Sequence, residues 1–182
     1  MDPITKYVHD YHSKLFQEHG ATPRGVDWRD EIEMYVRYDK MLTVLDKDFK
    51  TFDEPASLLD VGCGWGGLYR RAEQLKLPIL YTGADVVESM VDFGRKEFPN
   101  ATFIQQNVLD LDTEGAYDFV VGNGIFTQKL DLSIQDMEKY VRRMVRKMFQ
   151  LCRHGVAFNM ISTRVNFILL QCLHSNVTCA TR

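Results

Sequence analysis

The chain lacks the long hydrophobic run that a membrane-spanning helix requires. No segment approaches the roughly 20 consecutive apolar residues that would cross a bilayer. Its N-terminal stretch, MDPITKYVHDYHSK, is polar and mixed in charge, which is not typical of a signal peptide. We therefore expect a protein that does not enter membranes and that resides in the cytoplasm.

Cysteine is scarce and lacks the spacings of a metal site. The four cysteines form no CxxC pair, and the five histidines form no HExxH pattern. The sequence thus predicts no metal centre. We interpret Cys63, Cys152, Cys172 and Cys179 as free thiols of a reducing compartment.

An excess of positive charge is also missing. The net charge is -3, whereas dedicated nucleic-acid binders are usually basic. One basic stripe stands out, made of Lys139, Arg142, Arg143, Arg146 and Lys147. It either contacts nucleic acid or is the solvated face of a helix, and the net charge favours the second interpretation.

The sequence has the length and the apolar content of one folded domain. It has 182 residues, of which 45% are hydrophobic. Apolar residues at steps of three and four predict two helices, at 4–19 and 28–45, and these form an N-terminal helical cap over residues 1–50.

Strands and helices alternate in residues 56–162. Short apolar runs predict strands at 57–61, 79–85, 101–106, 117–122 and 155–162, with helices at 67–75, 87–98 and 132–152. Ser133, with Asp136 three residues on, predicts the start of the last helix. This alternation is typical of a doubly wound, mostly parallel α/β sheet.

The tail, residues 163–182, is short for this architecture. Its apolar patch, FILLQCL, folds back over the edge of the fifth strand, forms a contact between two copies of the chain in a homodimer, or marks a truncation. These alternatives stay open at the level of the sequence.

Four glycines gather where the first strand turns into its helix. Gly62, Gly64, Gly66 and Gly67 allow a bend in which a ligand can approach the backbone closely. The pattern DVGCGWGG fits the dinucleotide motif GxGxxG and also D-x-G-x-G-x-G. Asp60 would repel a pyrophosphate and attract a cation, and Trp65 would crowd a pyrophosphate. Both residues favour a cationic nucleoside over NAD.

A second acid, Asp85, ends the second strand, about 20 residues after the bend. An acid at this place can accept hydrogen bonds from the two ribose hydroxyls of a nucleoside cofactor. It can also cap the helix that follows, and the two roles can coexist.

Four segments in order carry a resemblance to a known family. LLDVGCGWG, GADVVESM, ATFIQQNVLDL and YDFVVGNGIF resemble the motifs of class I S-adenosylmethionine-dependent methyltransferases, and HGATPRGVDW resembles the cap of members that act on small molecules. The resemblance runs from about residue 56 to 162 and implies S-adenosylmethionine as the cofactor. The short tail departs from the family pattern, which continues with a further helix and two antiparallel strands.

The resemblance implies a set of cofactor contacts. Gly62, Cys63 and Gly64 pass close to the methionine part, Asp60 attracts its ammonium group, and Asp85 holds the ribose. Val86 packs on the adenine, and Val108 donates its backbone N–H to the ring. Many members have an acid where this chain has Asn107, whose amide oxygen can still accept from the adenine amino group. The carbonyl of Gly122, at the end of the fourth strand, meets the ammonium. Arg37 either pairs with the methionine carboxylate or is a solvated surface residue.

The acceptor side is less well defined by the sequence. The resemblance places Asn123, Phe126 and Gln128 on the acceptor side, although Phe126 can equally be a core residue. Tyr11 and His12 on the first helix are further candidates for substrate contact, or are packing residues. No general base stands out. The resemblance implies methyl transfer to a small molecule by in-line displacement. A non-catalytic module that binds S-adenosylmethionine and an NAD-dependent oxidoreductase remain as alternatives.

Overall fold

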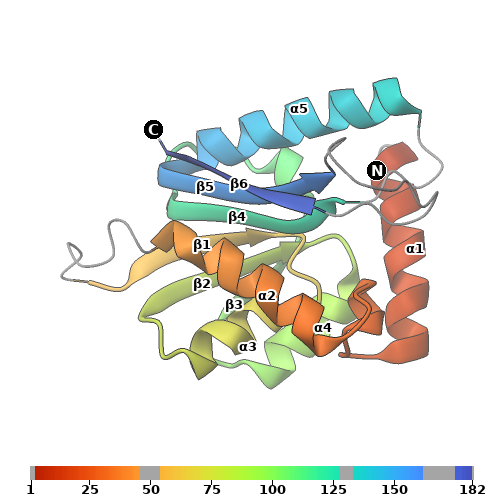
Figure 1. Cartoon of the computed structure of the whole chain (residues 1–182), viewed down its shortest axis with the longest axis horizontal. Coiled ribbons are helices and arrows are strands. Elements are labelled where there is room, and N and C mark those ends of the chain that lie inside the picture. The colour runs from red at the N-terminus through yellow and green to blue at the C-terminus, as the bar shows by residue number, and fades with distance from the viewer. Residues whose placement is uncertain (1–2, 46–53, 128–132, 162–174, 182) are drawn as a thin grey trace.

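A six-stranded sheet forms the centre of the molecule (Figure 1). The computed structural model describes residues 3–45, 54–127, 133–161 and 175–181. The strand order is β3-β2-β1-β4-β5-β6, in which β1 to β5 are parallel and β6 is antiparallel to β5. The doubly wound, mostly parallel α/β fold is thus confirmed.

The observed elements follow the predicted ones closely. They are α1 (Pro3–His19), η1 (Arg24–Val26), α2 (Glu31–Leu42), η2 (Thr43–Leu45), β1 (Ala56–Val61), α3 (Gly67–Gln74), β2 (Ile79–Asp85), α4 (Glu88–Glu97), β3 (Thr102–Gln105), η4 (Val108–Asp110), β4 (Tyr117–Phe126), α5 (Ile134–Leu151), β5 (Cys152–Ile161) and β6 (Ser175–Thr181).

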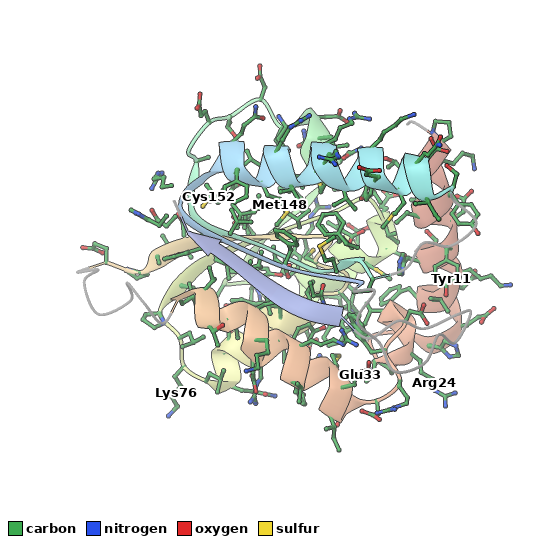
Figure 2. All side chains as sticks on the ribbon, turned by 45° about the horizontal axis from the view of Figure 1, so that its top comes forward. Tyr11, Arg24, Glu33, Lys76, Met148 and Cys152 are labelled. Atoms are coloured by element: carbon green, nitrogen blue, oxygen red, sulfur yellow. The ribbon has the colours of Figure 1, made fainter. Side chains whose placement is uncertain are left out.

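The central strands are buried on both faces, which explains why they read as continuous apolar runs. Leu58 of β1 belongs to a core with residues of α2, α3 and α4. Its neighbour Leu59 points to the other face, into a core with residues of α5. Met148 and Cys152 lie in this second core, between α5 and the sheet (Figure 2). The sheet is therefore wound on both sides.

Capping side chains fix the starts of α2 and α5. Ser133 Oγ accepts a hydrogen bond from the Asp136 N–H at 3.0 Å, as the sequence predicts for α5. The predicted start of the second helix at Trp28 is wrong. Asp30 caps α2 by accepting from the Glu33 N–H at 2.8 Å, and Asp27 has a left-handed backbone, so Trp28 lies in a loop.

The C-terminal end differs from the expectation in one respect. An antiparallel strand, β6, covers the edge of β5, with Ala157 opposite Cys179. The strand that covers this edge comes after the apolar patch 167–173, which lies outside the described residues. The edge that a parallel β5 would expose is thus paired.

The cap helix α1 stands at the end of the sheet where the parallel strands finish (Figure 1). It contacts η1 and α4. In open α/β sheets, ligands bind beyond the carboxyl ends of the strands. The position of α1 therefore closes one side of the region in which a ligand is expected.

Candidate functional site

A cavity opens between α1 and the carboxyl ends of β1, β2 and β4. Residues from all these elements line it, among them Thr5, Asp60, Asp85 and Asn123. In register, Asp60 of β1 lies opposite Gly83 of β2, so the ends of the two strands meet at one place. The cavity is where the sequence predicts the cofactor.

The glycine bend forms the floor of this cavity. Gly62 and Gly64 have φ angles of +69° and +54°, and both line the cavity. A Cβ on Gly62 would lie 2.4 Å from Ile125 Cγ2, and one on Gly64 would lie 2.9 Å from Val26 Cγ1. Glycine is therefore required here for conformation and for space.

The other two glycines of the bend have a different use. A Cβ on Gly66 would lie 2.7 Å from the Phe103 ring, and one on Gly67 would lie 2.3 Å from the Tyr38 hydroxyl. Neither lines the cavity. Only two of the four glycines, Gly62 and Gly64, thus face the cavity, whereas Gly66 and Gly67 allow close packing around the start of α3.

Asp60 is a buried acid on the cavity wall. Its side chain is 2% exposed, and its Oδ2 accepts a hydrogen bond from the Tyr81 hydroxyl at 2.7 Å. Burial raises its pKa to about 7, and the nearby Asp85 adds to the rise, whereas the Tyr81 hydrogen bond opposes it. A cationic group in the cavity would stabilise the ionised form of this carboxyl group.

Asp85 holds the turn that follows β2. Its Oδ2 accepts from the Gly64 N–H at 2.8 Å, and its Oδ1 accepts from the Val87 N–H at 2.9 Å. It thus caps the segment that leads into α4, the second role that the sequence allowed. Each carboxylate oxygen has a further acceptor position, so hydrogen bonds to two ribose hydroxyls are chemically compatible with this capping.

Asn107 and Val108 lie beside the bend, after β3. Both line the cavity, as does Val86. Asn107 Oδ1 accepts from the Leu109 N–H at 3.0 Å, and its Nδ2 donates to Thr5 Oγ1 at 3.2 Å. The amide therefore joins the expected adenine site to the cap helix, and its oxygen retains a second acceptor position.

The cap contributes one face of α1 and the loop before α2. Thr5, Val8 and His12 line the cavity, and so do Asp27 and Trp28. Burial lowers the pKa of His12, while the carboxylates of Asp85 and Asp27 act in the opposite direction. The direction favours a neutral imidazole, which can accept a proton.

Tyr11 does not line the cavity itself. Its hydroxyl donates to Asp27 Oδ2 at 2.8 Å and so fixes the loop that does. Figure 2 shows Tyr11 on α1. Asp27 and Trp28 were not predicted as wall residues, because the second helix was predicted to begin at Trp28. Both residues lie in the segment HGATPRGVDW, which resembles the cap of the family.

Asn123 stands on the β4 side of the cavity and is held by a neighbouring strand. Asn159 of β5 is 0% exposed, donates to Asn123 Oδ1 at 2.9 Å and accepts from the Gly124 N–H at 2.7 Å. This buried amide was not predicted, since an isolated Asn in a strand carries no signal. It holds residues 123–124, in the carboxyl-terminal part of β4, at the cavity wall.

Three predicted residues lie away from the cavity wall. Phe126 is 1% exposed and packs in the second core against the rings of Tyr140 and Phe158. Arg37 pairs with Glu33 at 2.7 Å and stacks over Trp28 at 4.5 Å. Trp65, expected to crowd a ligand, is 1% exposed and packs in the first core, with its Nε1 donating to the Thr22 carbonyl at 3.3 Å.

Gly122 occupies the middle of β4 and not its end. The strand continues to Phe126, because β5 pairs with it through Met160. A Cβ on Gly122 would lie 2.8 Å from Ile125 Cδ1 and 3.1 Å from Met148 Cε. The predicted end of this strand is therefore wrong, and a contact between the Gly122 carbonyl and an ammonium group stays a prediction. Gln128 lies outside the described residues.

Within the described ranges, no group of three or more His, Cys, Asp or Glu side chains could hold a metal ion. Nor is any helix of those ranges long and apolar enough to cross a membrane.

Comparison with known sequences gives one family. The model of a family described as "Methyltransferase domain" matches residues 58–155. A putative methyltransferase of Mycobacterium tuberculosis, Rv1506c, is 27% identical over 113 residues, which cover 60% of this chain and 66% of that protein. Clavatol synthase claF of Penicillium crustosum is 25% identical over 133 residues, 66% of this chain. The chain spans only 5% of the length of that relative.

Solved structures show the same fold. Magnesium protoporphyrin IX methyltransferase (ChlM) from Synechocystis PCC 6803, with bound SAM, superposes with a TM-score of 0.64 at 16% identity, over 96% of this chain and 81% of that one. The [4+2]-cyclase SpnF superposes with a TM-score of 0.60 at 18% identity, over 88% of this chain and 61% of that one. At these identities, the likeness concerns the fold alone.

Proposed function

The chain belongs to the family of S-adenosylmethionine-dependent methyltransferase domains, and from this premise we propose that it transfers the methyl group of S-adenosylmethionine to a small-molecule acceptor. One observation carries the proposal. Asp60, the Gly62–Gly64 backbone and Asp85 converge on one cavity at the ends of β1 and β2. There, a cationic nucleoside would find an acid for its ammonium group, an open backbone and an acid for its ribose.

The residues present fit the cofactor. Gly62, Cys63 and Gly64 leave room beside the backbone for the methionine part, and Asp60 is a buried carboxyl group without a basic partner among the groups that shift its pKa. Asp85 would hold the ribose, while Val86, Asn107 and Val108 would enclose the adenine. When bound, the cofactor supplies an electrophilic methyl group on a sulfonium centre.

The charge of the cavity wall supports a cationic nucleoside over a dinucleotide. Asp27, Asp60 and Asp85 line it, whereas no lysine or arginine of the described residues does. A pyrophosphate would meet these acids without a compensating cation. Trp65 takes no part in this choice, because it lies in the core.

The protein's contribution to the reaction would be to orient the acceptor and to exclude water. Asn123, held by Asn159, and the Trp28 ring border the space next to the bend. A neutral His12 is placed to take up the proton that a hydroxyl or amino acceptor releases. Phe126 would act indirectly, by packing against Tyr140 of the cavity wall. Arg37 would likewise act indirectly, by holding the Trp28 ring on which it stacks.

The test is ligand binding followed by turnover. S-Adenosylmethionine or S-adenosylhomocysteine should raise the melting temperature, since a ligand that binds only the folded state stabilises it, and NAD should not. A shift with NAD alone would favour an oxidoreductase. Release of S-adenosylhomocysteine in the presence of small-molecule acceptors then separates an enzyme from a module that only binds the cofactor.

We further propose a single domain over residues 1–182 that acts in the cytoplasm. The buried free thiols of Cys63 and Cys152 support a reducing compartment. A homodimer through the apolar patch 167–173 stays a proposal, and the mass of the protein in solution tests it.

A further inference from the structure

A groove on the surface lies directly beside the cofactor cavity. It is formed by the first turn of α1 and one side of α5, and its wall contains Lys139, Arg142, Arg143 and Arg146. We call it the basic groove. It contains most of the basic stripe for which the sequence allowed two interpretations, contact with nucleic acid or a solvated helix face.

The basic groove and the cavity are adjacent at one residue. Tyr140 lines both. Ile4 lines the groove while Thr5 lines the cavity, and Arg143 lines the groove while Met144 lines the cavity. A molecule that extends past Tyr140 would therefore occupy both spaces.

Two of the four basic side chains are already paired with acids of the same helix. Arg142 contacts Glu138 at 2.7 Å, and Lys139 lies 3.8 Å from Asp136. Arg143 and Arg146 form no ion pair with any residue that the structure describes. They lie three positions apart, on one side of α5. Guanidinium groups suit carboxylate and phosphate oxygens because they donate in a planar fork.

The charges of the two spaces are opposite. Within the described residues, the cavity is lined by three aspartates and by no lysine or arginine, whereas the groove is lined by four basic residues and one acid, Asp136. An anionic group would be repelled from the cavity and attracted to the groove. An acceptor with an uncharged reactive end would fit the cavity with that end and the groove with an anionic end.

We propose that the basic groove binds the anionic group, a phosphate or a carboxylate, of the methyl acceptor, while the reactive end of the acceptor enters the cavity past Tyr140. This rests on the proposed methyl transfer. It narrows the acceptor from any small molecule to one that carries an oxyanion several atoms away from the methylated centre.

The experiment uses the double variant Arg143→Gln/Arg146→Gln in the whole chain. Binding of pyrophosphate and of malonate is measured by calorimetry at low ionic strength, with the cofactor site saturated by S-adenosylhomocysteine. The matched control is Lys40→Gln/Lys96→Gln, which removes the same charge from exposed positions of α2 and α4. We expect at least one anion to bind, about fivefold more weakly to the double variant, and equally to wild type and control.

The outcomes distinguish the groove from the cofactor site. Binding of S-adenosylhomocysteine to all three proteins, without anion binding or with no loss in the double variant, overturns the groove proposal and leaves the proposed function intact. A single-stranded oligonucleotide that binds more tightly than pyrophosphate, and only when Arg143 and Arg146 are present, overturns it in favour of nucleic acid. If wild type itself does not bind S-adenosylhomocysteine, the result argues against the proposed methyl transfer.

Discussion

The carboxylate of Asp85 accepts a hydrogen bond from the backbone N–H of Gly64 at 2.8 Å. The acid at the end of β2 thus fixes the glycine bend that follows β1, the neighbouring parallel strand. Its other oxygen accepts from the Val87 N–H at 2.9 Å. One side chain therefore builds the floor of the cavity and faces the space in which the ribose is proposed to lie.

Asp85→Ala should reduce stability and cofactor affinity together. It removes two hydrogen bonds to a charged group, so we expect the free energy of unfolding to fall by about 2–4 kcal/mol. Denaturant unfolding without ligand and calorimetry with S-adenosylhomocysteine measure the two effects. Asp112→Ala, at an exposed acid, is the control. Unchanged stability with lost affinity would show that the bend does not depend on Asp85.

Gly62→Ala should be more damaging than an alanine at another glycine with positive φ. Both Gly62 and Gly115 are left-handed, which costs alanine about 1–2 kcal/mol. Only at Gly62 does the new methyl group also collide, at 2.4 Å from Ile125, whereas at Gly115 the nearest atom is 3.7 Å away. We expect Gly62→Ala alone to weaken S-adenosylhomocysteine binding, and equal effects of the two variants would contradict this.

Asp60 should make stability and ligand binding depend on pH in opposite directions. Its pKa is about 7 in the folded chain and about 3.9 in an unfolded one, so between these values the folded state binds more protons. The free energy of unfolding of the ligand-free protein should therefore fall as the pH rises through this window.

A cation in the cavity prefers ionised Asp60, so ligand affinity should rise with pH up to about 7. Calorimetry with S-adenosylhomocysteine should show proton release near pH 7 that Asp60→Asn abolishes. Tyr81→Phe removes the hydrogen bond that opposes the rise and should move the transition to higher pH. A pH-independent affinity of wild type would refute the role of Asp60.

Phe126 should behave as a core residue and not as a substrate contact. Phe126→Ala is expected to lower the free energy of unfolding by about 3–5 kcal/mol, and Phe126→Leu by less than about 1.5 kcal/mol. S-Adenosylhomocysteine should bind the leucine variant as it binds wild type, as calorimetry can show. If Phe126→Leu instead removed turnover at full stability, the acceptor assignment from the sequence would be restored.

The succession of strands and helices along the chain and the position of the bend could be predicted from local patterns. Apolar runs and capping residues are local, so β1, β2 and the start of α5 agree with the prediction. The predicted end of β4 was wrong, because its residues after Gly122 are held in the sheet by pairing with β5 and by Asn159, which lies 35 positions after Gly124. The start of α2 was misplaced because Trp28 fits the helical spacing while Asp27 adopts a left-handed backbone.

By itself, the sequence determined the fold, the family and two of the acids that line the cavity, Asp60 and Asp85, since these depend on residue types at fixed spacings along neighbouring strands and turns. Only the tertiary structure decided which glycines face the cavity, that Trp65 and Phe126 belong to the core, and that Asp27, Trp28 and His12 also line the cavity. It also placed the basic groove next to the cavity. These relationships join segments far apart in the chain, and side-chain packing in three dimensions sets which way each residue points.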